Sequence, residues 1–287
     1  MRLASFQTAD GRRSFGSVNP DGSIADLASG EVTGLRRALA DWGLAGLRQR
    51  AAEATRIVPA GAFAWLSPVT DPDKILCVGL NYSLHAQEAG MVIPKYPSMF
   101  VRFPGSQVGH GQPTVAPSAS EQYDYEAELA VVIGAEARDI DAADALSVVA
   151  GYACFAENSV RDFQRHAAQA TPGKNFESSG AFGPWITTAD EVPDPQALEV
   201  IGRLNGEVVQ HDSTARMIFT IAQIIAYTSL YTRLLPGDVI ATGTPAGVGA
   251  ARKPPRWLRA GDVFEVDIPG VGTLRNPVIA RAAGPGR

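Results

Sequence analysis

Two short apolar runs, residues 75–79 and 129–134, each end in glycine and contain no charged or amide side chain. A continuous apolar run of this length is typical of a strand that is buried on both faces. Residues 263–268 instead alternate apolar and acidic side chains, which predicts a strand with one buried and one solvated face. Asn205-Gly206 lies between two further apolar stretches and predicts a tight β-hairpin.

Helical spacing is weaker and occurs in two places. Residues 32–56 carry an imperfect apolar stripe that Gly43 and Gly46 interrupt. A clearer helix is predicted after Ser213, which can cap it, and before Pro236-Gly237, which would end it. Its apolar face is spaced as in a helix and consists of Met217, Ile221, Ile224 and Ile225.

The order of these elements predicts an α+β protein that is rich in β-structure. Short strands at residues 2–6, 13–18 and 24–27, with the helix that follows, form a small N-terminal α+β module over residues 1–65. Residues 59–72 are rich in Pro, Ala and Gly, and both helix and strand signals lapse there. A larger catalytic domain is therefore expected over residues 70–283.

Composition narrows the function classes. The 287 residues are 45% hydrophobic and 19% charged with a formal net charge of −5, so neither disorder nor nucleic-acid binding is expected. Two cysteines and four scattered histidines do not make a zinc site, whereas the 30 acids favour a hard cation held by carboxylates. No apolar stretch is long enough to span a membrane, and no signal peptide is evident, so a cytoplasmic protein is expected.

The acids that stand out are Glu126 and Glu128, in the sequence Asp-Tyr-Glu-Ala-Glu directly before the apolar run at residue 129. A strand would place both glutamates on one face, where two like charges need a cation. Exposure of both at the entrance of the strand is the alternative. Glu157 follows another apolar run and offers a third carboxylate, either on the wall of a site or at the start of a solvated helix.

A possible base lies just after the strand predicted at residues 75–79. His85 and Glu88 are three residues apart, so on a helix Glu88 would orient the imidazole and raise its basicity. The alternative is an exposed pair of neighbouring side chains. Lys174 lies in a Pro/Gly-containing loop, where a solvated lysine is the default. Residues 236–249 form a glycine-rich loop without a phosphate-binding signature, and a close approach of its backbone to a ligand is plausible.

Together these segments resemble the fumarylacetoacetate hydrolase family from Lys74 to Ile279. No single motif is specific, but they occur in the order found in the family. The resemblance rests on five motifs: K-I-L-C-V-G-L-N-Y-S-L-H-A-Q-E at 74–88, D-Y-E-A-E-L at 124–129, S-V-R-D-F-Q at 159–164, G-K-N-F at 173–176 and P-G-D-V-I-A-T-G-T-P-A-G-V-G at 236–249.

The resemblance implies a mixed β-sandwich or β-roll catalytic domain, a homodimer, and a divalent cation, usually Mg²⁺ with Mn²⁺ as the alternative. The implied ligands are Glu126, Glu128 and Glu157, although the family ordinarily has aspartate at the last position. The implied catalytic residues are His85, Glu88 and Lys174, and the implied substrate contacts are Gln164 and Thr244. Arg102 is added as a handle for a substrate carboxylate, because its planar fork suits bidentate recognition.

The function that these expectations favour is hydrolysis of a carbon–carbon bond in an acylpyruvate or a related 2,4-diketo acid, with water activated by His85. A first alternative keeps the cation and changes the reaction to decarboxylation, isomerisation or dehydration of a 2-oxo acid, such as oxaloacetate or a sugar-acid derivative. A second alternative is a degenerate member of the family that binds a metabolite without catalysis. The unusual Glu157 favours this alternative.

Overall fold

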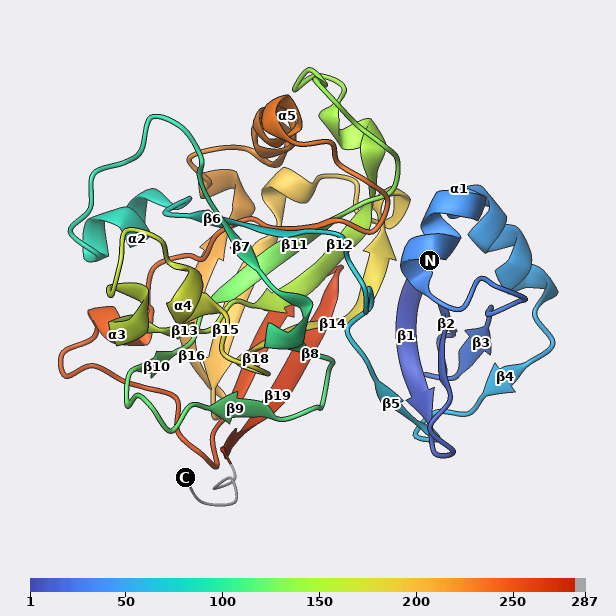
Figure 1. The fold of residues 1–287 in the computed structure, drawn as a ribbon, viewed down its shortest axis with the longest axis horizontal. Helices are drawn as coiled ribbons and strands as arrows, with labels where there is room; N and C mark the ends of the chain where they lie inside the picture. The colour runs from blue at the N-terminus through green and yellow to red at the C-terminus, as the bar shows by residue number, and fades with distance from the viewer. Residues whose placement is uncertain (282–287) are drawn as a thin grey trace.

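A twelve-stranded sheet forms the frame of the protein in a computed structural model, which describes residues 1–281 (Figure 1). Ten of its strands follow the order β4-β3-β2-β1-β14-β12-β11-β17-β6-β7, while β5 pairs with β1 and β8 with β14. The strands are β1 (Arg2–Thr8), β2 (Arg13–Val18), β3 (Ile24–Asp26), β4 (Ile57–Val58), β5 (Phe63–Trp65), β6 (Ile75–Gly79), β7 (Ser98–Arg102), β8 (Gln107–Val108), β11 (Ala127–Ile133), β12 (Val149–Ala156), β14 (Gly180–Thr188) and β17 (Val239–Ala241).

The centre of this sheet is buried on both faces, as the uninterrupted apolar runs predict. In β11, Leu129 and Val131 belong to one hydrophobic core, and Ala130 and Val132 belong to the core on the opposite face. The strand predicted at residues 75–79 coincides with β6. This two-sided burial fixes the direction of every side chain in β11, including that of the acid at its start.

A second, five-stranded sheet packs on one face of the first one, against β11, β12 and β14. Its order is β16-β15-β18-β19-β9, and the Asn205-Gly206 turn joins β15 to β16 as the sequence predicts. Strand β18 alternates half-buried and buried residues, so its prediction is also confirmed. The strands are β9 (Thr114–Ala116), β15 (Glu199–Leu204), β16 (Glu207–Ser213), β18 (Val263–Ile268) and β19 (Gly272–Ala280); a separate pair is formed by β10 (Tyr123–Asp124) and β13 (Ser159–Val160).

Helices are few and lie around the sheets (Figure 1). Helix α1 covers the face of the large sheet that the second sheet leaves free, and α5 packs into the core on the other face. The helices are α1 (Leu35–Glu53), α2 (Ser83–Glu88), α3 (Arg161–Gln164), α4 (Thr171–Lys174) and α5 (Ile221–Tyr231), and 3₁₀ turns lie at Pro104–Ser106, Ala145–Val148, Ala189–Glu191, Pro195–Ala197, Thr214–Arg216 and Gly249–Ala251.

The predicted start of α5 at Ser213 is wrong. Ser213 caps the short 3₁₀ turn at Thr214–Arg216, while Thr220 caps α5 in a reciprocal capping box with Gln223. The cause is a distant contact: Asn81 accepts hydrogen bonds from the backbone N–H groups of residues 218 and 219 and holds this segment extended. In α1, Gly43 has φ 58° and breaks the helical geometry, in line with the interrupted apolar stripe.

The N-terminal strands are not a separate sheet. Strand β1 pairs antiparallel with β14, with Leu3 opposite Ile186, so the strands expected of a small module continue the frame of the larger part. Figure 1 shows β1 to β5 and α1 gathered on one side of the molecule. The overall α+β, β-rich class is confirmed, and the boundary proposed near residues 65–70 stays a prediction. No helix in residues 1–281 combines the length and apolarity needed to cross a bilayer.

Candidate active site

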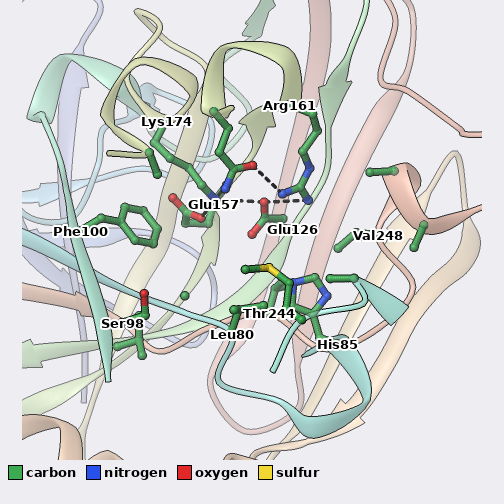
Figure 2. Close-up of a pocket in the computed structure, with 18 of the residues that line it drawn as sticks. Leu80, His85, Ser98, Phe100, Glu126, Glu157, Arg161, Lys174, Thr244 and Val248 are labelled. Carbon is green, nitrogen blue, oxygen red and sulfur yellow. Dashed lines mark hydrogen bonds and ion pairs between the residues drawn. The ribbon is translucent and has the colours of Figure 1, made fainter. Parts of the chain in front are cut away.

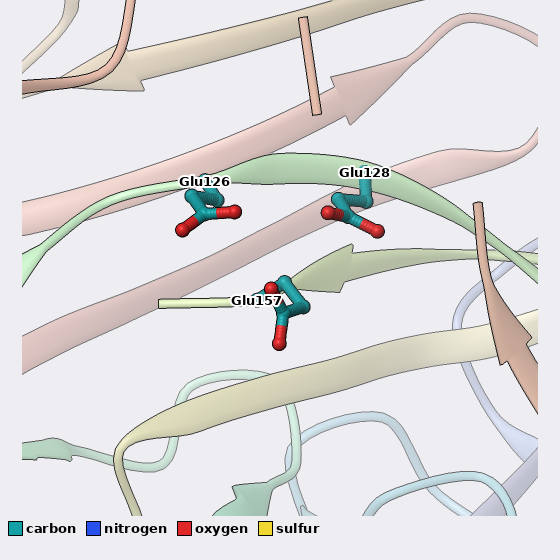
Figure 3. Close-up of side chains that lie close together, drawn as sticks. All are labelled: Glu126, Glu128 and Glu157. Atoms are coloured by element: carbon teal, nitrogen blue, oxygen red, sulfur yellow. The ribbon is translucent and has the colours of Figure 1, made fainter. Parts of the chain in front are cut away.

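Three glutamates meet at the end of the β11–β12 pair. Ala127 of β11 pairs with Ala156 of β12, so Glu126 and Glu157 lie opposite each other just beyond this pair. The Glu157 N–H donates to the Glu126 carbonyl at 2.9 Å. Glu128 lies two residues along β11 and points to the same face (Figure 3). All three are buried, and each offers a carboxylate oxygen within 4.8 Å of the others. The expectation that Glu126 and Glu128 share an inward face with Glu157 beside them is confirmed.

Burial and mutual repulsion act on these carboxyl groups unequally. Burial, and then the charges of Glu157 and Glu126, raise the pKa of Glu128 well above its ordinary value. Burial also raises the pKa of Glu157. For Glu126, burial is outweighed by Arg161 and Lys174, which lower its pKa. Within residues 1–281, Glu128 forms no ion pair; its Oε2 accepts a hydrogen bond from the Gly243 N–H at 2.8 Å.

The triad fits a hard divalent cation. All three donors are carboxylate oxygens, the ligand type that Mg²⁺ and Mn²⁺ prefer, and sulfur or imidazole is absent from this cluster. A group with a raised pKa between two other acids gains most from a nearby positive charge. Glu157 takes part although the family resemblance implies aspartate there, because its carboxylate still reaches the other two.

Lys174 is not the solvated lysine that its local sequence suggests. It is buried at the end of α4, where its Nζ lies 3.0 Å from Glu126 Oε1 and also donates to Glu157 Oε2. Although burial opposes it, the charges of Glu126 and Glu157 raise the pKa of Lys174, so the ammonium stays protonated. Its position beside two of the three glutamates agrees with the expectation of an active-site lysine.

His85 and Glu88 form the predicted pair on α2. The Nδ1 of His85 lies 2.8 Å from Glu88 Oε1, and both side chains are largely buried. Glu88 also accepts two hydrogen bonds from the Gly247 N–H, at 3.1 and 2.9 Å. Gly247 has φ 105°, and a Cβ there would lie 2.3 Å from the Val209 carbonyl, so this close approach of the backbone requires glycine.

Asp124 and Arg161 complete the support of the triad, and the sequence interpretation gave neither a role. Arg161 pairs with Glu126 at 2.9 Å and with Asp124 at 2.7 Å, and its Nη1 donates to Gln164 Oε1. Asp124 in turn accepts hydrogen bonds from the N–H groups of Gly249 and of the next residue. Their presence in the D-Y-E-A-E and S-V-R-D motifs was the available signal.

Gln164 and Thr244, the expected substrate contacts, both line the same cavity as the triad. The Thr244 hydroxyl donates to the Ala127 carbonyl at 2.9 Å and accepts a hydrogen bond from Gln210 Nε2 at 2.8 Å. Gln210, which the sequence interpretation missed, also accepts from the Ala127 N–H at 2.9 Å. Thr244 is thus fixed to the start of β11, while the contacts of both residues with substrate stay predictions.

Arg102 does not lie where a handle for a substrate carboxylate is needed. Its side chain is fully buried behind Glu157 and does not line the cavity. The guanidinium donates to Glu157 Oε1 at 3.1 Å instead. The fork that was expected to bind substrate is occupied by a carboxylate of the protein itself, because strand β7 ends beside the triad and not at the mouth of the cavity.

One cavity of about 550 Å³ brings these groups together. Glu126, Glu157 and Lys174 lie on one wall and His85 on the opposite one (Figure 2). Phe100, Leu80 and Val248 supply apolar surface between them. A small polar molecule in this space would meet the glutamate cluster on one side and a carboxylate-oriented imidazole on the other.

Comparison with known proteins agrees with this geometry. The sequence profile described as "Fumarylacetoacetate (FAA) hydrolase C-terminal" matches residues 74–279. The chain belongs to the fumarylacetoacetate hydrolase family. The matched residues carry all three glutamates, the His85–Glu88 pair and Lys174, and they span the interval over which the motifs suggested the resemblance.

Relatives in this family differ in reaction. The chain is 42% identical to the mitochondrial oxaloacetate tautomerase FAHD2A of Homo sapiens over 78% of this chain and 72% of that protein. Two solved structures are similar: a 2-hydroxyhepta-2,4-diene-1,7-dioate isomerase of Mycobacterium marinum (31% identity, 99% and 100% coverage, TM-score 0.80) and the maleylpyruvate hydrolase of Sphingobium sp. SYK-6 with manganese and pyruvate (30% identity, 98% and 100% coverage, TM-score 0.81). An enzymatic, metal-dependent activity of this family is therefore supported.

Proposed function

We propose that this protein is a divalent-cation-dependent enzyme that interconverts the keto and enol forms of a 2-oxo dicarboxylic acid, with oxaloacetate as the test substrate. The observation that carries the proposal is the single cavity in which the glutamate triad faces the His85–Glu88 pair. Similarity to oxaloacetate tautomerases supports this reaction over the hydrolysis favoured by the sequence interpretation.

Glu126, Glu128 and Glu157 would hold the cation, Mg²⁺ or Mn²⁺. When bound, it would supply Lewis-acid stabilisation of the negative charge that develops on the 2-oxo group. Lys174 would hold Glu126 and Glu157 in place through its contacts with both. The similarity to a hydrolase solved with manganese supports the choice of cation.

His85 would carry the proton. In the tautomer that donates Nδ1–H to Glu88, the basic nitrogen is Nε2, and Glu88 stabilises the imidazolium that forms when Nε2 takes a proton. Keto–enol exchange then removes a proton from C3 and returns one to oxygen, or the reverse, with no net gain or loss of atoms. The Gly247 N–H bonds hold Glu88 so that this orientation persists.

Arg165 supports a substrate with a second carboxylate. It lines the cavity, is exposed, and forms no ion pair among residues 1–281. The other cations of the wall, Arg161 and Lys174, are bound to acids of the protein. A free guanidinium at the mouth suits the distal carboxylate of oxaloacetate, since it can bind a carboxylate in a bidentate manner.

The test follows the decay of the enol absorbance of freshly dissolved oxaloacetate, with Mg²⁺ or Mn²⁺ and again after chelation. We expect metal-dependent acceleration by the wild type, and a loss of about 10²- to 10⁴-fold in His85→Asn with unchanged metal affinity. Pyruvate and CO₂ are measured in the same samples to detect decarboxylation. An enol decay equal to the uncatalysed rate under every metal condition would refute the proposal.

A second candidate is hydrolytic cleavage of an acylpyruvate. The His85–Glu88 pair is equally suited to remove a proton from water, and the maleylpyruvate hydrolase is similar over nearly the whole chain. Incubation of the metal-loaded enzyme with acylpyruvates in ¹⁸O-water distinguishes the two reactions. Label in the released acid would establish the hydrolase, and its absence with fast enol decay would leave the tautomerase.

A further inference from the structure

All three nitrogens of the Arg102 guanidinium donate hydrogen bonds. Nε donates to Ser106 Oγ at 3.1 Å, and Nη2 donates to Ser179 Oγ at 3.0 Å. Nη1 donates both to the Asn158 carbonyl at 3.0 Å and to Glu157 Oε1 at 3.1 Å. The guanidinium is thus held in one orientation, and its Nη1 contacts Glu157 of the glutamate triad.

The two oxygens of Glu157 consequently have different partners. Oε1 accepts from Arg102, and Oε2 accepts from Lys174. Glu126 shares Lys174 with Glu157 and pairs in addition with Arg161, while Glu128 accepts a hydrogen bond from the Gly243 N–H. Within residues 1–281, Arg102 pairs with Glu157 and with no other carboxylate.

We propose that Arg102 is a positioning residue, which fixes the Glu157 carboxylate in the orientation that a divalent cation needs and so sets the cation affinity of the triad. The inference rests on the proposed metal-dependent function. Glutamate has one more rotatable bond than the aspartate that the family resemblance implies at this position. Ordering that bond costs entropy when the cation binds, unless another contact has already ordered it. The Arg102 fork supplies that contact.

Charge alone would act in the opposite direction. A guanidinium next to a cation site repels the cation, so simple removal of Arg102 would strengthen binding through Coulomb energy while it loosens Glu157. Arg102→Lys separates the two effects because it keeps the positive charge and removes the planar fork. One ammonium on a flexible stem cannot keep the contacts of Nε, Nη1 and Nη2 together.

The experiment is a double-mutant cycle on cation affinity, read by calorimetric titration of metal-free protein with Mn²⁺ and Mg²⁺. The four proteins are the wild type, Arg102→Lys, Glu157→Asp and the double variant. Because groups that orient metal ligands contribute strongly, Arg102→Lys should weaken binding about 10- to 100-fold. In the Glu157→Asp background, Arg102→Lys should weaken cation binding less than about threefold, since the contact between residues 102 and 157 is already broken there.

Two controls keep the result interpretable. Arg252→Lys removes a fork that binds the Tyr125 hydroxyl and the Val209 carbonyl, outside the triad, and should leave the affinity unchanged. Ser179→Ala keeps Arg102 and removes one of its anchors; it should weaken binding about 2- to 10-fold, and it replaces Arg102→Lys if that variant does not fold. The electron paramagnetic resonance spectrum of bound Mn²⁺ reports the altered ligand geometry independently of activity.

Wild-type affinity in Arg102→Lys, or an equal loss in both backgrounds, would overturn the inference. If that variant does not fold, wild-type affinity in Ser179→Ala would overturn it. A wild-type protein that binds neither Mg²⁺ nor Mn²⁺ would instead overturn the proposed function, so the two failures are distinguishable.

Discussion

Two clusters of charged side chains around buried acids differ in electrostatic character. Near the N-terminus, Asp26 is a single carboxylate with Arg12 at 2.8 Å and Arg56 at 2.7 Å. It also accepts hydrogen bonds from Ser14 Oγ at 2.5 Å and the Ala28 N–H at 3.2 Å. Although burial opposes ionisation, these partners lower the pKa of Asp26.

In the glutamate triad, the neighbouring cations Arg102, Arg161 and Lys174 pair with Glu126 and Glu157 and not with Glu128. Three carboxylates lie within 4.8 Å, and the one without an ion pair in residues 1–281, Glu128, has a raised pKa because of burial and the charges of Glu157 and Glu126. A buried carboxylate with cationic partners of its own needs no further charge, whereas a buried carboxylate without such a partner would gain from a bound cation. Asp26 and Glu128 are both buried, yet their pKa values shift in opposite directions, because Asp26 has cationic partners and Glu128 has acidic neighbours.

The largest effect is expected when the triad loses one carboxylate. Glu128→Gln should lower cation affinity and reduce activity by about 10³-fold, because several kcal/mol of charge stabilisation are lost with the metal. The metal-free variant should be no less stable than wild type, since it relieves repulsion. Calorimetric titration, the enol-decay assay and urea unfolding measure the three quantities. Unchanged cation affinity would show that the triad is not the metal site.

The matching change at Asp26 should lower stability and leave cation affinity unchanged. Asp26→Asn removes the charge that two arginines share and should lower the free energy of unfolding by about 1.5–3 kcal/mol, the range for hydrogen bonds to charged groups. Both arginines are partly exposed, so solvent screening keeps the effect below that of a fully buried pair. Cation affinity and activity should not change. Urea unfolding and titration test both statements, and a loss of cation affinity would contradict the division between the clusters.

The contributions of Asp26 and Glu128 to the stability of the metal-free protein should change with pH in opposite directions. A lowered pKa in the folded state means that Asp26 stabilises the fold fully above its ordinary pKa near 3.8 and loses this effect as the pH falls through the lowered value. The raised pKa of Glu128 means that metal-free protein is penalised increasingly as the pH rises above the ordinary value near 4.5. Destabilisation by Asp26→Asn should therefore fade in acid, and stabilisation by Glu128→Gln should grow with pH. Urea unfolding of the metal-free proteins from about pH 3 to about pH 8 measures both.

The smallest effect concerns the free charge at the mouth of the cavity. Arg165→Gln should raise KM for oxaloacetate about tenfold, as loss of one charge-assisted contact implies, and leave kcat, cation affinity and stability unchanged. KM for an acylpyruvate with a single carboxylate should not change, which makes that substrate the matched control. An equal rise of KM for both substrates would show that Arg165 does not read the second carboxylate.

Local patterns were sufficient to predict several strands, and the family resemblance was needed to single out the triad; both were insufficient wherever a distant contact decides. The apolar run of β6 and the Asn205-Gly206 hairpin are encoded within a few residues. The start of α5 depends on Asn81, more than a hundred residues earlier, and no feature near Ser213 reveals that contact. Lys174 and Arg102 were misjudged locally for the same reason, because their burial involves the packing of α4 against β7 and β13, which come from other parts of the chain.

The glycine-rich loop at residues 236–249 holds acidic residues on both walls of the cavity in place. Three of its amides hold acids from three different segments: Gly243 holds Glu128, Gly247 holds Glu88 and Gly249 holds Asp124. An insertion or deletion in this loop would displace the cation cluster and the base together. A loop transplanted from a relative should work only if it keeps the spacing of these three glycines. New substrate ranges are then expected to arise from changes at Arg165, Ala168 and Ala170, which line the cavity next to this support.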